Sequence, residues 1–361
     1  MPRIRLCRPE DPPLVQRFLE DHWARGHVLA RNRALFDWQY HHPGHDRWEL
    51  VLAWEGEDLL GVLGFIAPDR YDPALADRST LWLALWKSRE EQAGPGLGLA
   101  MLRFLEDTIP HAAIGVVGIN PLHPPLYRAM GFCSGELTQW VLFNPLARSC
   151  LALVPAGFHC PSPSPGSGTI GLVPLDRDGL QTLALPEAGR PAQPLKTPHY
   201  FINRFLEHPF YHYGVHGLVR DGTTVALLAS RELGHGSARA LRLVDYLGDP
   251  THLAGCGPAL ARLLAAEGYE YADCWAVLPD PEPLARAGFL AVDPDGGLVV
   301  PSHFEPFRQA NERLRYAFKG PGDHQIFRAD GDQDRPNRLT PMDGDGRFPA
   351  AMVRDGAMPK P

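Results

Sequence analysis

Three closely spaced glycines form the motif in this 361-residue chain that most directly indicates chemistry. Gly94, Gly96 and Gly98 stand between an apolar run at 81–86 and a helical pattern that begins near Leu97. A glycine turn between a strand and a helix brings backbone N–H groups close to an anion, so the motif indicates a phosphate site. A tight turn without any ligand is the alternative interpretation.

The spacing of the glycines excludes two common phosphate ligands. A dinucleotide fingerprint needs a third glycine at position 99 or 101, where Leu99 and Met101 stand. The strand expected at 112–120 carries no carboxylate that could hold a ribose. The Lys and Ser/Thr of a nucleotide-binding P-loop are also absent. A pyrophosphate held by backbone N–H groups and the ligand-free turn remain as interpretations.

A second group of polar residues lies near the end of the chain, in the stretch "DGDQDRPN" at 330–337. Its carboxylates could bind sugar hydroxyls, and Arg335 could bind a phosphate through two parallel hydrogen bonds. A calcium loop is one alternative, but the downstream bidentate Glu is missing. A solvated turn is the other. The stretch supplies four candidate substrate-binding residues: Asp332, Asp334, Arg335 and Asn337.

Composition narrows the class of protein. The formal net charge of −7 argues against a nucleic-acid partner. Neither a signal-peptide layout nor a run of about 18 apolar residues is present, so we expect a cytoplasmic protein without a membrane partner. None of the six cysteines form a C-x-x-C pair, which predicts free thiols and no metal site. The sequence does not indicate an oligomeric state.

Hydrophobic patterns predict an α/β fold with a mixed sheet. In the first part of the chain we expect strands at 3–7, 48–67 (a hairpin), 79–87, 112–120 and 135–145, with helices at 10–26, 97–109 and 123–132. A similar order follows at 169–289, with an Asp221-Gly222 hairpin turn and a second glycine turn at 253–258. Gly255 follows Gly96 by 159 positions and Gly288 follows Gly131 by 157, which indicates a duplicated domain.

Four segments are therefore predicted. Residues 1–150 form a catalytic domain, and 151–168 form a linker rich in Pro, Ser and Gly. Residues 169–340 form a second, degenerate domain that shapes the acceptor site. The stretch 341–361 lacks periodicity and is expected to be a disordered tail.

The first domain resembles the acyl-coenzyme A core of the GNAT acetyltransferase superfamily. The resemblance is carried by "GPGLGLAML" after a strand, then Asn120, Tyr127 and Gly131-Phe132 in "NPLHPPLYRAMGF". The family's loop usually opens with Arg or Gln, where this chain has Ala93. Five further stretches resemble bacterial tandem-GNAT enzymes that N-acylate nucleotide-linked amino sugars for surface polysaccharides: "LFDWQYHHP", "VLGFI", "LWLALWK", "SHFEPF" and "DGDQDRPN".

This resemblance implies two tandem GNAT-like domains and an acetyl- or other acyl-CoA cosubstrate. The implied cofactor-binding residues are Leu85, Trp86, Lys87, Gly94, Gly96, Leu97, Gly98 and Asn120. Tyr127 would protonate the leaving thiolate, for which a phenol of pKa near 10 is suited; a packed aromatic is the alternative. Candidate bases for the amine are Asp37, His303, Glu305, Asp330, Asp332 and Asp334. Trp38 could stack on a nucleotide base, although core packing is more common for such a residue.

The second copy has Ala285 where the first has Tyr127, so a single catalytic centre is predicted. Two other functions stay open at this stage. One is acylation of a peptide, aminoglycoside or metabolite amine. The other is a non-catalytic scaffold that binds coenzyme A or a nucleotide.

Overall fold

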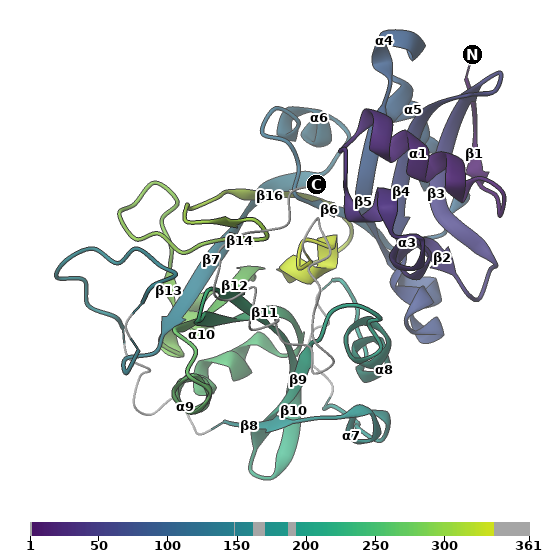
Figure 1. Ribbon diagram of the computed structural model, residues 1–361. Helices are drawn as coiled ribbons and strands as arrows, with labels where there is room; N and C mark the ends of the chain where they lie inside the picture. The colour runs from purple at the N-terminus through teal and green to yellow at the C-terminus, as the bar shows by residue number, and fades with distance from the viewer. Residues whose placement is uncertain (1, 148, 162–169, 187–192, 336–361) are drawn as a thin grey trace.

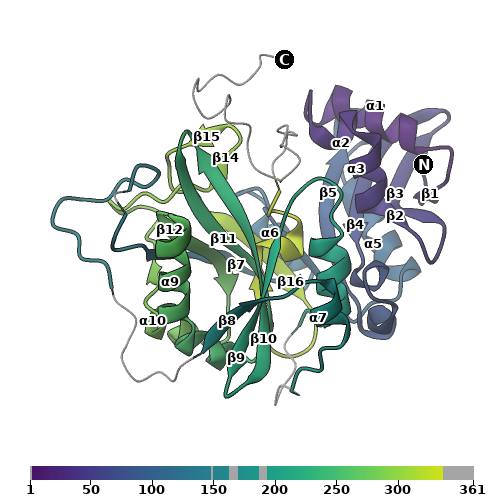
Figure 2. The same cartoon turned by 60° about the horizontal axis from the view of Figure 1, so that its bottom comes forward.

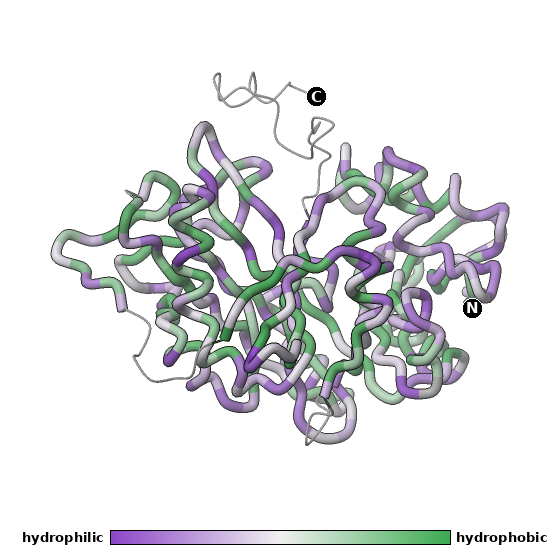
Figure 3. The backbone as a smooth tube through the Cα atoms, turned by 90° about the horizontal axis from the view of Figure 1, so that it is seen from below, coloured by the Kyte–Doolittle hydropathy of each residue, from purple (hydrophilic) through white to green (hydrophobic). Residues whose placement is uncertain are grey.

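The computed structural model describes residues 2–147, 149–161, 170–186 and 193–335. A single mixed sheet of 15 strands runs through two lobes (Figure 1). The N-terminal lobe carries β1 to β6 with α1 to α6, and the C-terminal lobe carries β8 to β13 with α7 to α10. Hydrophobic segments lie inside each lobe and hydrophilic ones gather in outer loops (Figure 3). No helix among these residues is long and apolar enough to cross a bilayer.

The N-terminal lobe is a sheet covered by helices on both faces. Because side chains alternate along β3, Leu50 and Leu52 face α1 to α3 while Val51 and Ala53 face α5. Its strands are β1 (Arg3–Cys7), β2 (His41–His42), β3 (Arg47–Glu55), β4 (Asp58–Ile66), β5 (Thr80–Ser88) and β6 (Ala113–Val117). Its helices are α1 (Pro12–His22), α2 (Val28–Arg31), α3 (Arg33–Tyr40), α4 (Glu90–Ala93), α5 (Leu97–Thr108) and α6 (Pro124–Ala129), with 3₁₀ turns η1 (Pro68–Arg70) and η2 (Pro73–Arg78).

The C-terminal lobe repeats this plan. The β9–β10 hairpin turns at Asp221 and Gly222, whose φ angles of 50° and 79° are those of a two-residue hairpin turn. Its strands are β8 (Gly171–Pro174), β9 (Gly214–Arg220), β10 (Thr223–His235), β11 (Ala238–Gly248), β12 (Tyr271–Val277) and β13 (Leu290–Ala291). Its helices are α7 (Arg177–Gln181), α8 (Pro198–Phe201), the π-turn η3 (Ile202–Leu206), the 3₁₀ turn η4 (Pro250–Gly255), α9 (Gly257–Glu267) and α10 (Glu282–Arg286).

The remaining elements lie at or between the lobes. They are β7 (Cys133–Phe143), β14 (His303–Phe304), β15 (Phe307–Arg308), β16 (Leu314–Lys319), β17 (Ile326–Phe327) and the 3₁₀ turn η5 (Arg328–Gly331). The yellow η5 turn lies between the two lobes in both ribbon views (Figures 1 and 2).

The two lobes exchange strands. β7 pairs with β16 through residues 133–137 and with β12 through residues 138–143. β16, which comes from the end of the described chain, lies between β6 and β7 in the N-terminal lobe. The order β1-β3-β4-β5-β6-β16-β7 is therefore matched by β8-β9-β10-β11-β12-β7-β13, with parallel pairing only at β5–β6 and β11–β12.

This repeated order confirms the predicted fold class of tandem domains with a mixed sheet. The domain boundaries stay a prediction. Residues 314–319, which the prediction places in the second domain, pair in the N-terminal lobe.

The strand exchange predicts that the lobes depend on each other for stability. Ala317 of β16 is fully buried, so Ala317→Asp places an unpaired carboxylate in the N-terminal lobe. We expect a loss of about 3 kcal/mol or more in the free energy of unfolding, measured by urea titration. Circular dichroism and tryptophan fluorescence should report one shared transition. The exposed Ala100→Asp on α5 is the control and should change stability little. Two separate transitions would contradict coupling through β16.

Candidate functional site

The opening between β5 and β6 is the first feature of the site. The two strands pair in parallel only from Thr80–Leu83 to Ala113–Val116, whereas β5 continues to Ser88. On the other edge of β5, the register with β4 shifts at Ala84, which forms a bulge. Beyond the bulge, no described strand pairs with the β6-facing edge of β5. Its backbone N–H groups are therefore available to a ligand.

The glycine turn lies next to this opening. Gly94 and Gly96 adopt φ angles of 76° and 94°, and α5 begins at Leu97 with no side-chain cap on its first turn. The first N–H groups of α5 therefore lack protein acceptors, as an anion site requires. A Cβ at Gly98 would lie 3.0 Å from Trp86 Nε1, so glycine lets α5 pack closely on β5. Ala93 contributes no polar side chain.

Tyr127 reaches the same place from α6. Its ring is buried and lies edge-on to Trp86 at 6.2 Å and to Phe132 at 5.3 Å, between ring centroids. Among the described residues its hydroxyl has no hydrogen-bond partner, and burial raises its pKa well above 10. Asn120 is exposed and accepts a hydrogen bond from Leu122 N–H at 2.9 Å, in the turn that precedes α6.

Trp86 therefore brings together the predicted residues Leu85, Lys87, Gly98 and Tyr127. Leu85 and Lys87 are its neighbours on β5, Gly98 packs against its indole and Tyr127 lies beside it.

The equivalent place in the C-terminal lobe is filled by protein. β11 and β12 also part after residues 243 and 274, but β17 pairs with β12 at Ala276 and Val277. A Cβ at Gly257 would lie 1.9 Å from the Ala287 carbonyl oxygen, so the start of α9 is closed. The second predicted glycine turn is thus packed closely against protein. The single cofactor site stays a prediction.

The acidic stretch near the chain end is buried between the lobes rather than solvated. Asp330 Oδ1 lies 2.8 Å from Lys196 Nζ, and its Oδ2 accepts a hydrogen bond from Phe327 N–H at 2.7 Å. Lys196 also pairs with Asp245 of β11, so one buried ammonium is shared by two carboxylates. Burial raises the pKa of Asp330 and of Asp245, the latter to about 7.

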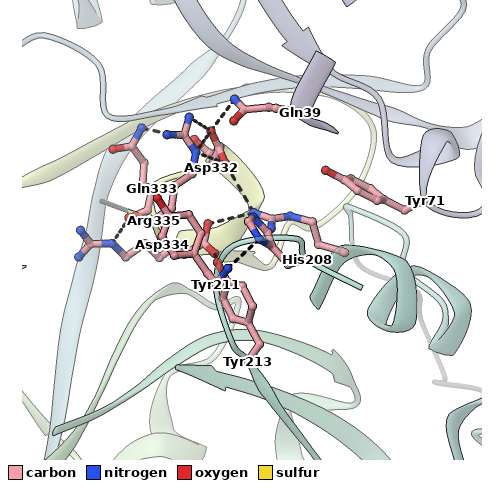
Figure 4. A network of polar contacts seen from close by, with 12 residues as sticks. Gln39, Tyr71, His208, Tyr211, Tyr213, Asp332, Gln333, Asp334 and Arg335 are labelled. Carbon is pink, nitrogen blue, oxygen red and sulfur yellow. Dashed lines mark hydrogen bonds and ion pairs between the residues drawn. The ribbon is translucent and has the colours of Figure 1, made fainter. Parts of the chain in front are cut away.

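Asp332 and Asp334 belong to a second ion network, shown in Figure 4. Arg335 binds Asp332 through Nε and Nη2, and Gln39 of α3 donates to Asp332 Oδ2 at 2.7 Å. Asp334 accepts hydrogen bonds from Arg204 at 3.0 Å and from the Tyr213 hydroxyl at 2.6 Å. These contacts give all three aspartates structural partners. Their catalytic and substrate-binding roles stay predictions without geometric support; Asn337 lies outside the described residues.

The predicted residues Asp37 and Trp38 lie apart from this ion network, in an open groove of about 520 Å³ between the lobes. Asp37 accepts a hydrogen bond from Trp48 Nε1 at 2.7 Å and pairs with Arg33. The Trp38 ring lies 4.0 Å from that of His208, between centroids. The groove and the cavity described next share no lining residue.

Four of the predicted residues line one small cavity of about 60 Å³: His303, Glu305, Asp334 and Arg335. The cavity also contains residues that were not predicted, namely Arg231, Arg242, Ser302, Arg328 and Gln333. We name it the arginine cavity. The sequence contains one signal for these buried arginines. A lone arginine stands inside each of two apolar strands, "VALLASREL" and "ALRLVDYL".

The arginine cavity adjoins the end of β6. A Cβ at Gly118 would lie 3.0 Å from Gln333 Cδ, so the cavity wall touches the loop between β6 and Asn120. His303 is half-exposed, and its Nε2 lies 2.7 Å from Glu312. Burial lowers the His303 pKa, so the ring is neutral at pH 7.

One group of possible metal ligands occurs within the described ranges: His42, His45 and Asp69. His42 Nδ1 accepts a hydrogen bond from Gly44 N–H at 3.1 Å, and its Nε2 lies 3.4 Å from Asp69. Because both ring nitrogens have protein partners, these contacts explain the group without an ion. These contacts do not test the prediction that the protein binds no metal.

Glu49 of β3 gives the N-terminal lobe a distinctive pH dependence. Its carboxyl is fully buried, and burial raises its pKa from 4.5 to about 7. The folded state therefore holds this proton more tightly than the unfolded chain. The protonated Glu49 carboxyl therefore makes a contribution to stability that is complete below pH 4.5 and is lost as the pH rises through 7.

Glu49→Gln should consequently be the more stable protein at pH 8, by up to about 3 kcal/mol. The difference from wild type should disappear near pH 5. Urea unfolding at several pH values measures it. Glu55→Gln, an exposed substitution on the same strand, is the control. Equal pH slopes for Glu49→Gln and wild type would disprove the assignment.

Comparison with known proteins identifies the fold. No protein-family model matches the chain, and no curated protein matches it. A GCN5-related N-acetyltransferase from Anabaena variabilis is similar, with a TM-score of 0.50 and 11% identity over 88% of this chain and 72% of that one. A GCN5-related N-acetyltransferase from Kribbella flavida gives a TM-score of 0.50 and 11% identity, over 88% and 71%. The chain therefore has the fold of these acetyltransferases.

Proposed function

We propose that the protein is an acyl-coenzyme A-dependent N-acyltransferase with one active centre in the N-terminal lobe. The proposal rests on three structural features that meet at Trp86. An unpaired strand edge, an uncapped helix start behind a glycine turn and a buried tyrosine all lie against this one residue. Acyl transfer from a thioester needs these parts: an anion cradle, donors for the carbonyl and an acid for the leaving group.

Each part has a residue to supply it. The first turn of α5 would bind the diphosphate of coenzyme A through its free N–H groups. The backbone of β5 beyond Ala84 would hold the pantetheine arm and polarise the thioester carbonyl. Tyr127 would donate its proton to the departing thiolate, since a phenol that burial keeps neutral is a proton donor at pH 7.

The contacts separate the candidate bases. Asp330, Asp332 and Asp334 are buried and already paired with cations of the protein, namely Lys196, Arg335 and Arg204 respectively, so we assign them structural roles. His303 lines the arginine cavity, is half-exposed and is neutral at pH 7. A neutral imidazole can accept the proton of an attacking amine, so we infer that His303 is the best-supported base of the predicted set.

We propose a nucleotide-linked amino sugar as the acceptor, which is what the resemblance to tandem enzymes of surface polysaccharide synthesis implies. The arginine cavity beside the end of β6 supports an anionic acceptor, because four arginines line it against two acidic residues. Thiol release from acetyl-CoA should be measured with nucleotide-linked amino sugars, free amino sugars, aminoglycosides and peptides. Release only with the nucleotide-linked class supports the proposal. Release only with other amines would replace it, and binding without turnover would indicate a scaffold.

Tyr127→Phe tests the acid. Removing the proton donor should lower kcat by about 100-fold or more, with little change in KM for acetyl-CoA. Folding should be unaffected, because the hydroxyl has no partner to lose. Tyr269→Phe, which removes a hydroxyl bonded to Glu232 in the other lobe, is the matched control. Unchanged kcat in Tyr127→Phe would exclude the role.

Gly96→Ala tests the cradle. A side chain at this φ of 94° meets no neighbouring atom but strains the backbone by about 1–2 kcal/mol. We expect KM for acetyl-CoA to rise at least tenfold, because the strained turn cannot present its N–H groups. Gly222→Ala carries a similar strain at φ 79° in the β9–β10 turn and should leave KM unchanged. Equal KM values in both variants would argue against a cofactor role for the turn.

A further inference from the structure

The arginine cavity contains an unusual pair of like charges. Arg231 of β10 and Arg242 of β11 are directly opposite each other in the antiparallel register, and both are buried. Like charges in this position destabilise a sheet. Arg242 is compensated by Asp273, which it binds through Nε and Nη2 at 2.9 Å and 2.6 Å.

Arg231 is far less well satisfied. Its Nη1 donates to the Asp334 carbonyl at 2.9 Å, whereas its buried Nε and Nη2 have no hydrogen-bond acceptor among the residues that the structure describes. The ion pair with Glu305 spans 3.7 Å, which is too long for a hydrogen bond. A buried guanidinium with two free donors is costly unless a ligand supplies the acceptors.

Arg328 adds a second incompletely matched cation to the same wall. Its Nη1 donates to Ser302 Oγ at 2.9 Å and its Nε to the Gln333 carbonyl, but no carboxylate in the described ranges lies within ion-pair distance of it. Burial and the nearby Arg242 lower its pKa to about 9. Both Arg231 and Arg328 therefore gain from a negatively charged group in the cavity.

We infer that the arginine cavity binds a phosphate group of the acceptor, with Arg231 and Arg328 as its ligands. A volume of 60 Å³ holds roughly four waters, which suits one phosphoryl group rather than a whole nucleotide. The planar fork of arginine matches two phosphate oxygens. The identity of the phosphate as part of a nucleotide-linked amine rests on the proposed function. Gln333 of the cavity wall packs against Gly118 at the end of β6, so the cavity and the thioester opening are neighbours.

Inorganic phosphate is the probe, titrated calorimetrically into the full chain saturated with desulfo-coenzyme A, which is added to occupy the glycine turn. Wild type should bind one phosphate per chain, and acetate at equal ionic strength should not compete. Arg231→Gln should weaken binding at least tenfold. Arg262→Gln, an exposed arginine on α9, is the control and should bind as wild type does.

Absence of binding to wild type, competition by acetate, or equal affinity in Arg231→Gln would each overturn the inference. If Arg231→Gln does not fold, Arg328→Gln carries the same comparison. The proposed function can fail separately. Arginine-dependent phosphate binding without acylation of any nucleotide-linked amine would reject that function and leave the cavity assignment intact. Acylation of a nucleotide-linked amine with the same acceptor KM in Arg231→Gln and in wild type would support the proposed function and reject the cavity assignment.

Discussion

Backbone pairing of β16 with β6 and β7 is the interaction on which the rest of the structure depends. It inserts the end of the described chain into the N-terminal lobe, while the second half of β7 completes the C-terminal lobe. Each lobe is thus closed by a strand from the other. The return of the chain also places residues 326–335 between the lobes, where their side chains contact residues of both lobes.

The same return explains why the two lobes differ in structure at their glycine turns. In the N-terminal lobe no described strand pairs across the opening between β5 and β6, and the start of α5 has no side-chain cap. In the C-terminal lobe β17 pairs along β12, and the Ala287 carbonyl covers the start of α9. The start of α9 is therefore packed against protein, and Ala285 stands where the N-terminal lobe has Tyr127.

Local patterns in the sequence were sufficient for the main strands and for the repeat, but they did not predict the helices α2 and α3. The β3–β4 and β9–β10 hairpins, the glycine turn and the parallel strands follow from hydrophobic periodicity and turn residues. The place of β16 could not be predicted, because its six residues carry no signal for partners at 114–117 and 133–137. The acidic stretch "DGDQDRPN" has the composition of a solvated or ligand-binding loop. Its cationic partners Lys196, Arg204 and Arg231 lie more than 90 positions away, so local reasoning could not assign it to the interior.

The central claim is a single coenzyme A site, in the N-terminal lobe. Equilibrium titration of the full chain with desulfo-coenzyme A tests it most directly, because the stoichiometry does not depend on the acceptor. One molecule per chain, protecting the backbone amides of residues 84–99 from hydrogen exchange, is the expected result. Two molecules per chain, or protection confined to the start of α9, would contradict it.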